Sequence, residues 1–87
     1  MICNNIDEVR ANIDKIHTTP MGIDRIRRNL TLADIDVVEY CKNKILDPHC
    51  HIYKNGKNWY CEIDGARITV NSFSYTIITA HKITSTK

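Results

Sequence analysis

Apolar residues in the first half of the chain recur every three or four positions, the spacing that places side chains along one stripe of an α-helix. Three successive stripes are visible. Their members are Ile6, Val9, Ile13 and Ile16, then Ile23, Ile26 and Leu30, then Leu32, Ile35, Val38, Cys41 and Ile45. The pattern predicts helices over residues 5–16, 20–29 and 32–46.

Capping residues and prolines support these limits. Thr19 before Pro20 is typical of an N-cap followed by proline at the first helical position. Thr31 is expected to begin the third helix, and Pro48 to end it near Leu46, because proline cannot continue a helix.

In the second half of the chain apolar and polar residues alternate, as in strands that bury one face. Asn55-Gly56 predicts a two-residue type I′ hairpin turn, and Asp64-Gly65 predicts another. Counting outward from the first turn sets Cys50 opposite Cys61 and Tyr53 opposite Asn58. Counting from the second turn sets Glu62 opposite Arg67. The predicted strands cover residues 50–54, 57–63, 66–70 and 75–81.

These two registers divide the sheet into an apolar face and a polar face. The apolar side chains are Cys50, Ile52, Trp59, Cys61, Ile63, Ala66, Ile68 and Val70. The polar ones are His51, Tyr53, Asn58, Tyr60, Glu62, Arg67 and Thr69. Because a slip of one residue would exchange the faces, the clean separation supports both registers.

The sequence does not determine which side chains of the last predicted strand face the core. A four-residue loop before it places Tyr75, Ile77, Thr79 and His81 on the core face, whereas a loop of three or five residues places Thr76, Ile78 and Ala80 there. The face of His81 therefore stays open at this stage. The expected architecture is one α+β domain over residues 1–87, with three N-terminal helices packed on one face of a four-stranded antiparallel β-meander.

Composition narrows the class of protein. Hydrophobic residues make up 43% and charged residues 25% of the 87 positions, which is ordinary for a globular domain, and the net charge of +2 does not indicate a nucleic-acid-binding protein. No apolar run approaches the ~18 residues of a membrane span, and the N-terminus lacks a secretory pattern. We expect a cytoplasmic protein without a membrane partner, whose cysteines stay reduced.

Cys41, Cys50 and Cys61 are candidate ligands of a structural zinc ion, because zinc prefers four sulfur or nitrogen ligands. His81 is the expected fourth ligand, with His49 or His17 as alternatives. The spacing matches no standard zinc motif, so three buried reduced thiols, or a Cys50–Cys61 disulfide, remain alternatives. Cys3 is expected to be free.

A partner-binding surface is expected on the second helix and on the polar sheet face, since tyrosine and arginine concentrate binding energy at interfaces. Its residues are Arg25, Arg27, Arg28, Tyr53, Tyr60 and Arg67. The alternative for the arginine cluster is a solvated face that pairs with Asp or Glu. A DNA-reading role is not favoured, because Asp34, Asp36 and Glu39 on the third helix would repel phosphates.

A second constellation points to acid/base chemistry. It combines His17 and His81 with Tyr60, Tyr75, Thr79 and the arginines. Small ribonuclease toxins of the barnase and RelE type place such residues on an antiparallel sheet backed by helices. The alternative is that each histidine only caps an element.

Two stretches carry a family resemblance: K-I-H-T-T-P-M-G-I-D-R-I-R-R-N-L, and G-K-N-W-Y-C-E-I-D with I-T-V-N-S-F-S-Y-T-I-I-T-A-H-K. Together they resemble a family of small bacterial and phage proteins, the domain of unknown function DUF3781. The resemblance implies a setting in Gram-positive bacteria and their mobile elements, where some small proteins are anti-CRISPR inhibitors that bind a CRISPR effector nuclease. We therefore expect a zinc-stabilised cytoplasmic inhibitor with no catalytic residues, and a ribonuclease as the alternative.

Overall fold

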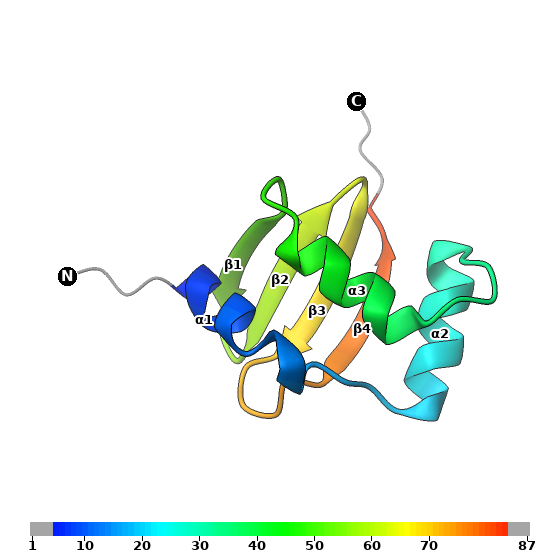
Figure 1. The fold of residues 1–87 in the computed structure, drawn as a ribbon, viewed down its shortest axis with the longest axis horizontal. Coiled ribbons are helices and arrows are strands. Elements are labelled where there is room, and N and C mark those ends of the chain that lie inside the picture. Colours follow the sequence, from blue (N-terminus) through cyan, green and yellow to red (C-terminus); the bar gives the residue numbers. More distant parts are fainter. Residues whose placement is uncertain (1–4, 84–87) are drawn as a thin grey trace.

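A computed structural model describes residues 5–83 of the chain, so Cys3 lies outside the described residues. Its elements are α1 (Asn5–Ala11), the short 3-10 helix η1 (Ile13–Lys15), α2 (Pro20–Leu30), α3 (Val37–Leu46), β1 (His51–Asn55), β2 (Asn58–Ile63), β3 (Ala66–Asn71) and β4 (Ile77–Lys82). The strands form one antiparallel sheet in the order β1-β2-β3-β4. Figure 1 shows α1 and α3 across one face of the sheet and α2 beside β4, which confirms the α+β fold.

Two helices are shorter than predicted. The helix expected over 5–16 stops at Ala11 and continues only as η1, because Asn12 bonds the Glu8 carbonyl through its side chain as well as its main chain. The helix expected from residue 32 begins at Val37, because Thr31 closes α2 in the left-handed conformation, with φ 56°. Asp36, whose carboxylate accepts from Glu39 N at 3.1 Å, is the N-cap of α3.

The start of α2 agrees with the prediction. Thr19 is its N-cap, with the hydroxyl accepting a 3.0 Å hydrogen bond from Gly22 N, and Pro20 occupies the first turn.

The first hairpin differs from its predicted register by two residues. Asn55 lies opposite Asn58, and Ile52 rather than Cys50 lies opposite Cys61. The turn consists of Gly56, with φ 67°, and Lys57 with an ordinary negative φ, an arrangement typical of a type II′ turn with glycine first. Because the shift is even, every side chain keeps its predicted face.

The second hairpin is confirmed. Asp64 and Gly65, both with positive φ, form the turn, and Glu62 lies opposite Arg67 as predicted.

Neither of the two predicted sets of core-facing residues holds for the whole of β4. The reason is that its pairing with β3 shifts between Thr69 and Val70. Ile77 lies opposite Val70, whereas Thr79 lies opposite Thr69, so Ile78 is the additional residue of a β-bulge. Ile77 and Ala80 are consequently both buried on the helix side.

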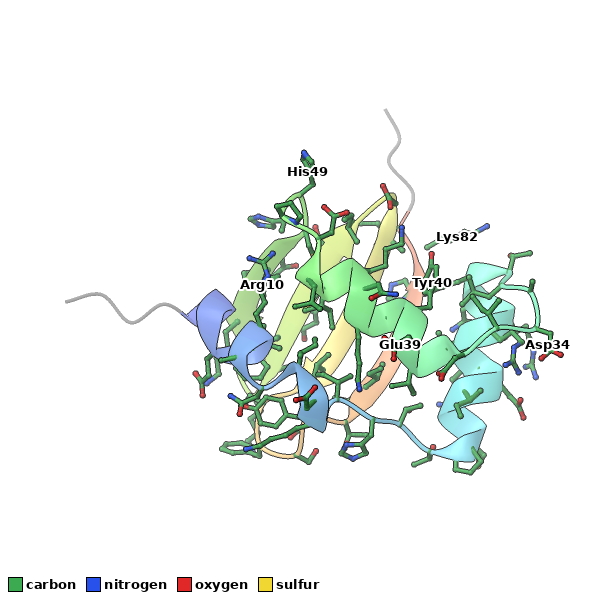
Figure 2. All side chains as sticks on the ribbon, viewed as in Figure 1. Arg10, Asp34, Glu39, Tyr40, His49 and Lys82 are labelled. Atoms are coloured by element: carbon green, nitrogen blue, oxygen red, sulfur yellow. The ribbon has the colours of Figure 1, made fainter. Side chains whose placement is uncertain are left out.

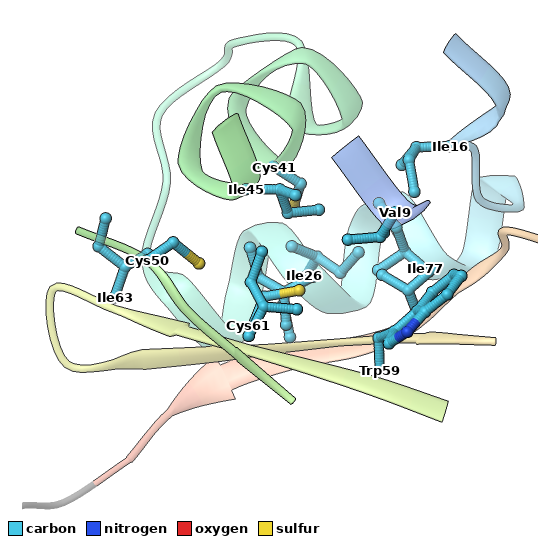
Figure 3. Close-up of a cluster of buried hydrophobic side chains, with 14 of the residues drawn as sticks. Val9, Ile16, Ile26, Cys41, Ile45, Cys50, Trp59, Cys61, Ile63 and Ile77 are labelled. Carbon is cyan, nitrogen blue, oxygen red and sulfur yellow. The ribbon is translucent and has the colours of Figure 1, made fainter. Parts of the chain in front are cut away.

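A single hydrophobic core fills the space between helices and sheet. Trp59, Cys41 and Cys61 have no exposed surface within it. Figure 3 shows side chains of α1, α2 and α3 meeting those of the strands there. Within residues 5–83, no helix is long and apolar enough to cross a membrane.

Candidate functional site

The sheet face opposite the helices carries a connected group of polar and aromatic side chains. We call this group the open-face cluster; its members are His51, Tyr53, Tyr60, Glu62, Arg67 and His81. Strand alternation brings them together, since Ile52, Cys61 and Ile68, which lie beside them in β1, β2 and β3, point into the core. The two tyrosines and Arg67 were predicted from the sequence as part of a binding surface, and the structure places these three on adjacent strands.

Tyr53 and Tyr60 are direct cross-strand partners. Their rings stack, with centroids 5.4 Å apart and planes inclined by 25°, and His51 tilts against Tyr53 at 5.3 Å. The predicted register set Tyr53 opposite Asn58, so the stacked pair follows from the type II′ turn. Aromatic pairs of this kind stiffen a sheet surface.

Glu62 holds the cluster together. Its Oε2 atom accepts a 2.8 Å hydrogen bond from the Tyr53 hydroxyl and a 2.9 Å hydrogen bond from Arg67 Nε. The Arg67 guanidinium also lies over the Tyr60 ring, 5.8 Å from its centroid. Glu62 was not among the site residues predicted from the sequence, although its predicted position opposite Arg67 was a signal that could have identified it.

These contacts change the acidity of the two groups that share them. The hydrogen bond from Tyr53, followed by that from Arg67, lowers the pKa of Glu62 below its ordinary value. The bond to Glu62 raises the pKa of Tyr53. At neutral pH the cluster therefore presents a carboxylate, a phenol and a guanidinium in fixed positions.

His81 lies on this open face, because it is the cross-strand partner of Arg67. The expected zinc set of Cys41, Cys50, Cys61 and His81 is therefore not assembled, since the cysteines face the helices. Among the described residues, no group of three or more His, Cys, Asp or Glu side chains is arranged to hold a metal ion.

The three cysteines are buried as free thiols. Cys61 lies on β2, with Cys50 just before β1 and Cys41 on α3 above them (Figure 3). Burial raises the pKa of Cys41 to about 12. A hydrogen bond between the other two thiols lowers the pKa of Cys50 and raises that of Cys61.

The arginines of α2 form a separate surface. Arg25 and Arg28 are exposed, and together with Met21 and Asp24 they line a shallow hollow on the outer side of the helix. Arg27 instead holds the loop before α3: its Nη2 donates a 3.0 Å hydrogen bond to Ile35 O. Because α2 lies beside β4, the structure separates the predicted binding surface into two patches (Figure 1).

Arg27 also approaches two carboxylates, at 3.8 Å from Asp24 and 4.0 Å from Asp34. Figure 2 shows Asp34 on this outer loop. Arg27 is thus engaged within the chain.

The residues predicted for acid/base chemistry also lie in two separate places. His17 lies at the end of the sheet, with Nδ1 2.8 Å from Lys15 O and Nε2 3.1 Å from Thr76 Oγ1. Since a carbonyl only accepts, Nδ1 carries the proton of a neutral ring, in which Nε2 accepts from the threonine. His81, Thr79 and Tyr60 are on the open face instead.

Comparison with known proteins identifies one family. A family model described as "Protein of unknown function (DUF3781)" matches residues 10–81. A search of curated proteins and a search of solved structures found no match.

Proposed function

Starting from a chain that belongs to the DUF3781 family, whose function is unknown, we propose a small binding protein that contacts a larger macromolecule through the open-face cluster. The observation that supports this is the stacked pair Tyr53–Tyr60, fixed from both sides by Glu62 and Arg67. Side chains already held in one conformation lose little entropy on binding, and tyrosine and arginine are frequent anchors of interfaces.

A protein partner suits this surface better than a nucleic acid. The Glu62 carboxylate lies among the aromatic rings and would repel phosphates, while a protein surface can offer a donor to it. We further propose that the protein comes from bacteria or phages and acts as an anti-CRISPR inhibitor of an effector nuclease. This finer proposal rests on the family resemblance, and the cytoplasm of the host is its setting.

A cleavage assay tests the proposal. The purified protein is added to CRISPR effector nucleases of Gram-positive bacteria, and both cleavage of target DNA and direct binding are measured. Arg67→Ala should weaken inhibition and binding, whereas Arg25→Ala on α2 is the matched control and should not. Loss in Arg25→Ala but not in Arg67→Ala would move the interface from the open face to α2. Full cleavage by every nuclease would reject the anti-CRISPR role.

One observation favours a second function, a ribonuclease. His81 and Arg67 are cross-strand partners, and Tyr60 and Thr79 lie on the same face, so an acid/base group stands near a cation and hydroxyls. Cleavage of total RNA that is lost in His81→Ala but kept in His49→Ala would support an enzyme. His49 is the control because its ring is exposed in the turn before β1.

We also propose, as a separate and independent point, that zinc can bind the three sulfur atoms of Cys41, Cys50 and Cys61. Cys50 and Cys61 already share a hydrogen bond, but the three thiols do not form a ligand set in this structure, so binding would require their side chains to rearrange. The zinc content of protein never exposed to a chelator, measured by elemental analysis, tests this proposal.

A further inference from the structure

The two edges of the sheet differ in how they are covered. Along β4, side chains from α2 and from the residues just before it donate hydrogen bonds to main-chain oxygens. The Thr18 hydroxyl donates to Ile77 O at 3.0 Å, and Asn29 Nδ2 donates to Ala80 O at 3.2 Å. Hydrogen bonds of this kind occupy main-chain groups of the edge strand that could otherwise pair with a further strand.

At the opposite edge α1 contacts β1, but none of the side-chain hydrogen bonds found within residues 5–83 reaches the β1 main chain. The type II′ turn makes Asn55–Asn58 a hydrogen-bonded pair, and such pairs alternate along an antiparallel ladder. Tyr53 therefore directs its main-chain groups toward β2, whereas Ile52 and Lys54 direct theirs away from the sheet. None of the hydrogen bonds found outside helices and strands in residues 5–83 involves a main-chain atom of Ile52 or Lys54.

We propose that this edge binds a second copy of the chain, with the two β1 strands antiparallel and Tyr53 on the two-fold axis. The outward groups of Ile52 then bond those of Lys54 in the other copy, and the reverse. Tyr53 faces Tyr53 of the other copy as the non-hydrogen-bonded pair between them. The two sheets become one sheet of eight strands, and the open-face clusters become continuous.

The sequence of β1 is suited to pairing with itself in this register. Lys54, its only charged residue, lies opposite Ile52 of the other copy, so no like charges meet across the axis. The rings of Tyr53 and Tyr60 already stack, and pairing extends this row across the axis. The strand contains no proline that would prevent pairing.

The expected dimer is weak and reversible. Five residues of strand bury much less than the ~1,200 Å² of a stable interface, so association should depend on protein concentration. This inference rests on the edge geometry and does not depend on the proposed function.

Cysteine crosslinking tests the register. Tyr53→Cys places one thiol of each copy face to face at a non-hydrogen-bonded pair, where the Cβ atoms are close enough for a disulfide. Under mild oxidation with copper phenanthroline and oxygen, this variant should form covalent dimers several-fold more than Asn55→Cys. Asn55 is the matched control because it lies on the same face and strand but opposite His51 of the other copy. The unsubstituted protein supplies the background from its own thiols.

Sedimentation of the unmodified chain tests the association itself. The wild type should shift from monomer to dimer as concentration rises, and Lys54→Pro should remove the shift. That proline deletes an outward N–H without touching the β1–β2 ladder, so circular dichroism should stay unchanged. In addition, Tyr53→Lys and Tyr53→Glu should each be monomeric and should associate when mixed.

Equal crosslinking at positions 53 and 55 overturns the proposal. A wild type that stays monomeric at millimolar concentration also overturns it. The β1 edge would then be a candidate binding site for an extended segment of another protein.

Discussion

The hydroxyl of Tyr53 donates a 2.8 Å hydrogen bond to the carboxylate of Glu62, its diagonal neighbour on the next strand. The same oxygen accepts from Arg67 on the strand beyond, so one carboxylate links three strands through their side chains. On an otherwise solvent-facing sheet surface, this makes Glu62 the residue that fixes how the tyrosines are presented.

The first prediction concerns how the stability of the fold depends on pH through Glu62. Because the folded-state pKa of Glu62 lies below its ordinary value of 4.5, ionised Glu62 stabilises the fold at any pH above that value. This contribution should be lost as pH falls through the lowered pKa. We expect Glu62→Gln to be less stable than the wild type at pH 7, and the difference in free energy of unfolding to vanish in strong acid. Urea unfolding of both proteins over a pH series measures it.

Tyr53→Phe is the companion variant, since it removes the hydrogen bond that lowers the pKa of Glu62 most but keeps the ring. It should reduce the pH-dependent difference without abolishing it, because Arg67 still pairs with Glu62. A difference between the wild type and Glu62→Gln that is as large in strong acid as at neutral pH would contradict the role given to the carboxylate.

How far the sequence alone leads is clear from the first hairpin. Alternation correctly predicts which face each of Cys50, Ile52 and Cys61 occupies, because a shift of two residues does not change facing. It cannot predict which residues are opposite, since Asn55-Gly56 suits a type I′ turn and Gly56-Lys57 a type II′ turn. The stacked tyrosines, and hence the candidate site, depend on that choice.

A bulge limits the prediction for β4 in a similar way. No loop length reproduces the burial of both Ile77 and Ala80, because they belong to opposite phases of a regular strand. The place of His81 on the open face, opposite Arg67, follows from the same bulge. Its zinc role could therefore not be judged from spacing, whereas the capped start of α2 could be predicted because Thr19 and Pro20 act locally.

The second prediction concerns Gly22, at the close approach of α2 to β4. Alanine ordinarily stabilises a helix by about 1 kcal/mol relative to glycine. Here a Cβ atom would clash with the Thr18 hydroxyl, which donates to Ile77 O. We expect Gly22→Ala to lower the free energy of unfolding in spite of the gain in helix propensity, as measured by urea titration.

A double-mutant cycle isolates the clash. Thr18→Ala removes the obstructing hydroxyl, so Gly22→Ala should be much less harmful, or stabilising, in that background. Additive effects of the two substitutions would show that the helix does not need this glycine for its packing on β4.

The third prediction separates the arginines of α2. Arg27→Glu removes the hydrogen bond to Ile35 O and places a negative charge near Asp24 and Asp34, so it should cost about 1–3 kcal/mol of stability. Arg28→Glu, at the next position but exposed, should change stability little. Thermal unfolding monitored by circular dichroism compares the two. A loss of equal size in both would mean that the Arg27 contacts do not hold the loop.

The last prediction concerns Cys41 and the zinc proposal. If zinc is bound, the protein should contain about one zinc ion per chain, and chelation should lower its melting temperature, because metal binding in such sites contributes directly to folding. Cys41→Ser should then release the metal, whereas a matched surface change such as Ser74→Ala should not.

A zinc content near zero in untreated protein would reject the proposal and leave Cys41 as a neutral thiol in the core, in agreement with its pKa of about 12. In that case Cys41→Ser should still cost about 1–3 kcal/mol, because a hydroxyl would replace the sulfur at a position with no exposed surface. Cys41→Ala should lack this polar penalty, and chelator should change the stability of neither variant. Comparing serine with alanine, with and without chelator, therefore distinguishes a metal ligand from a buried apolar side chain.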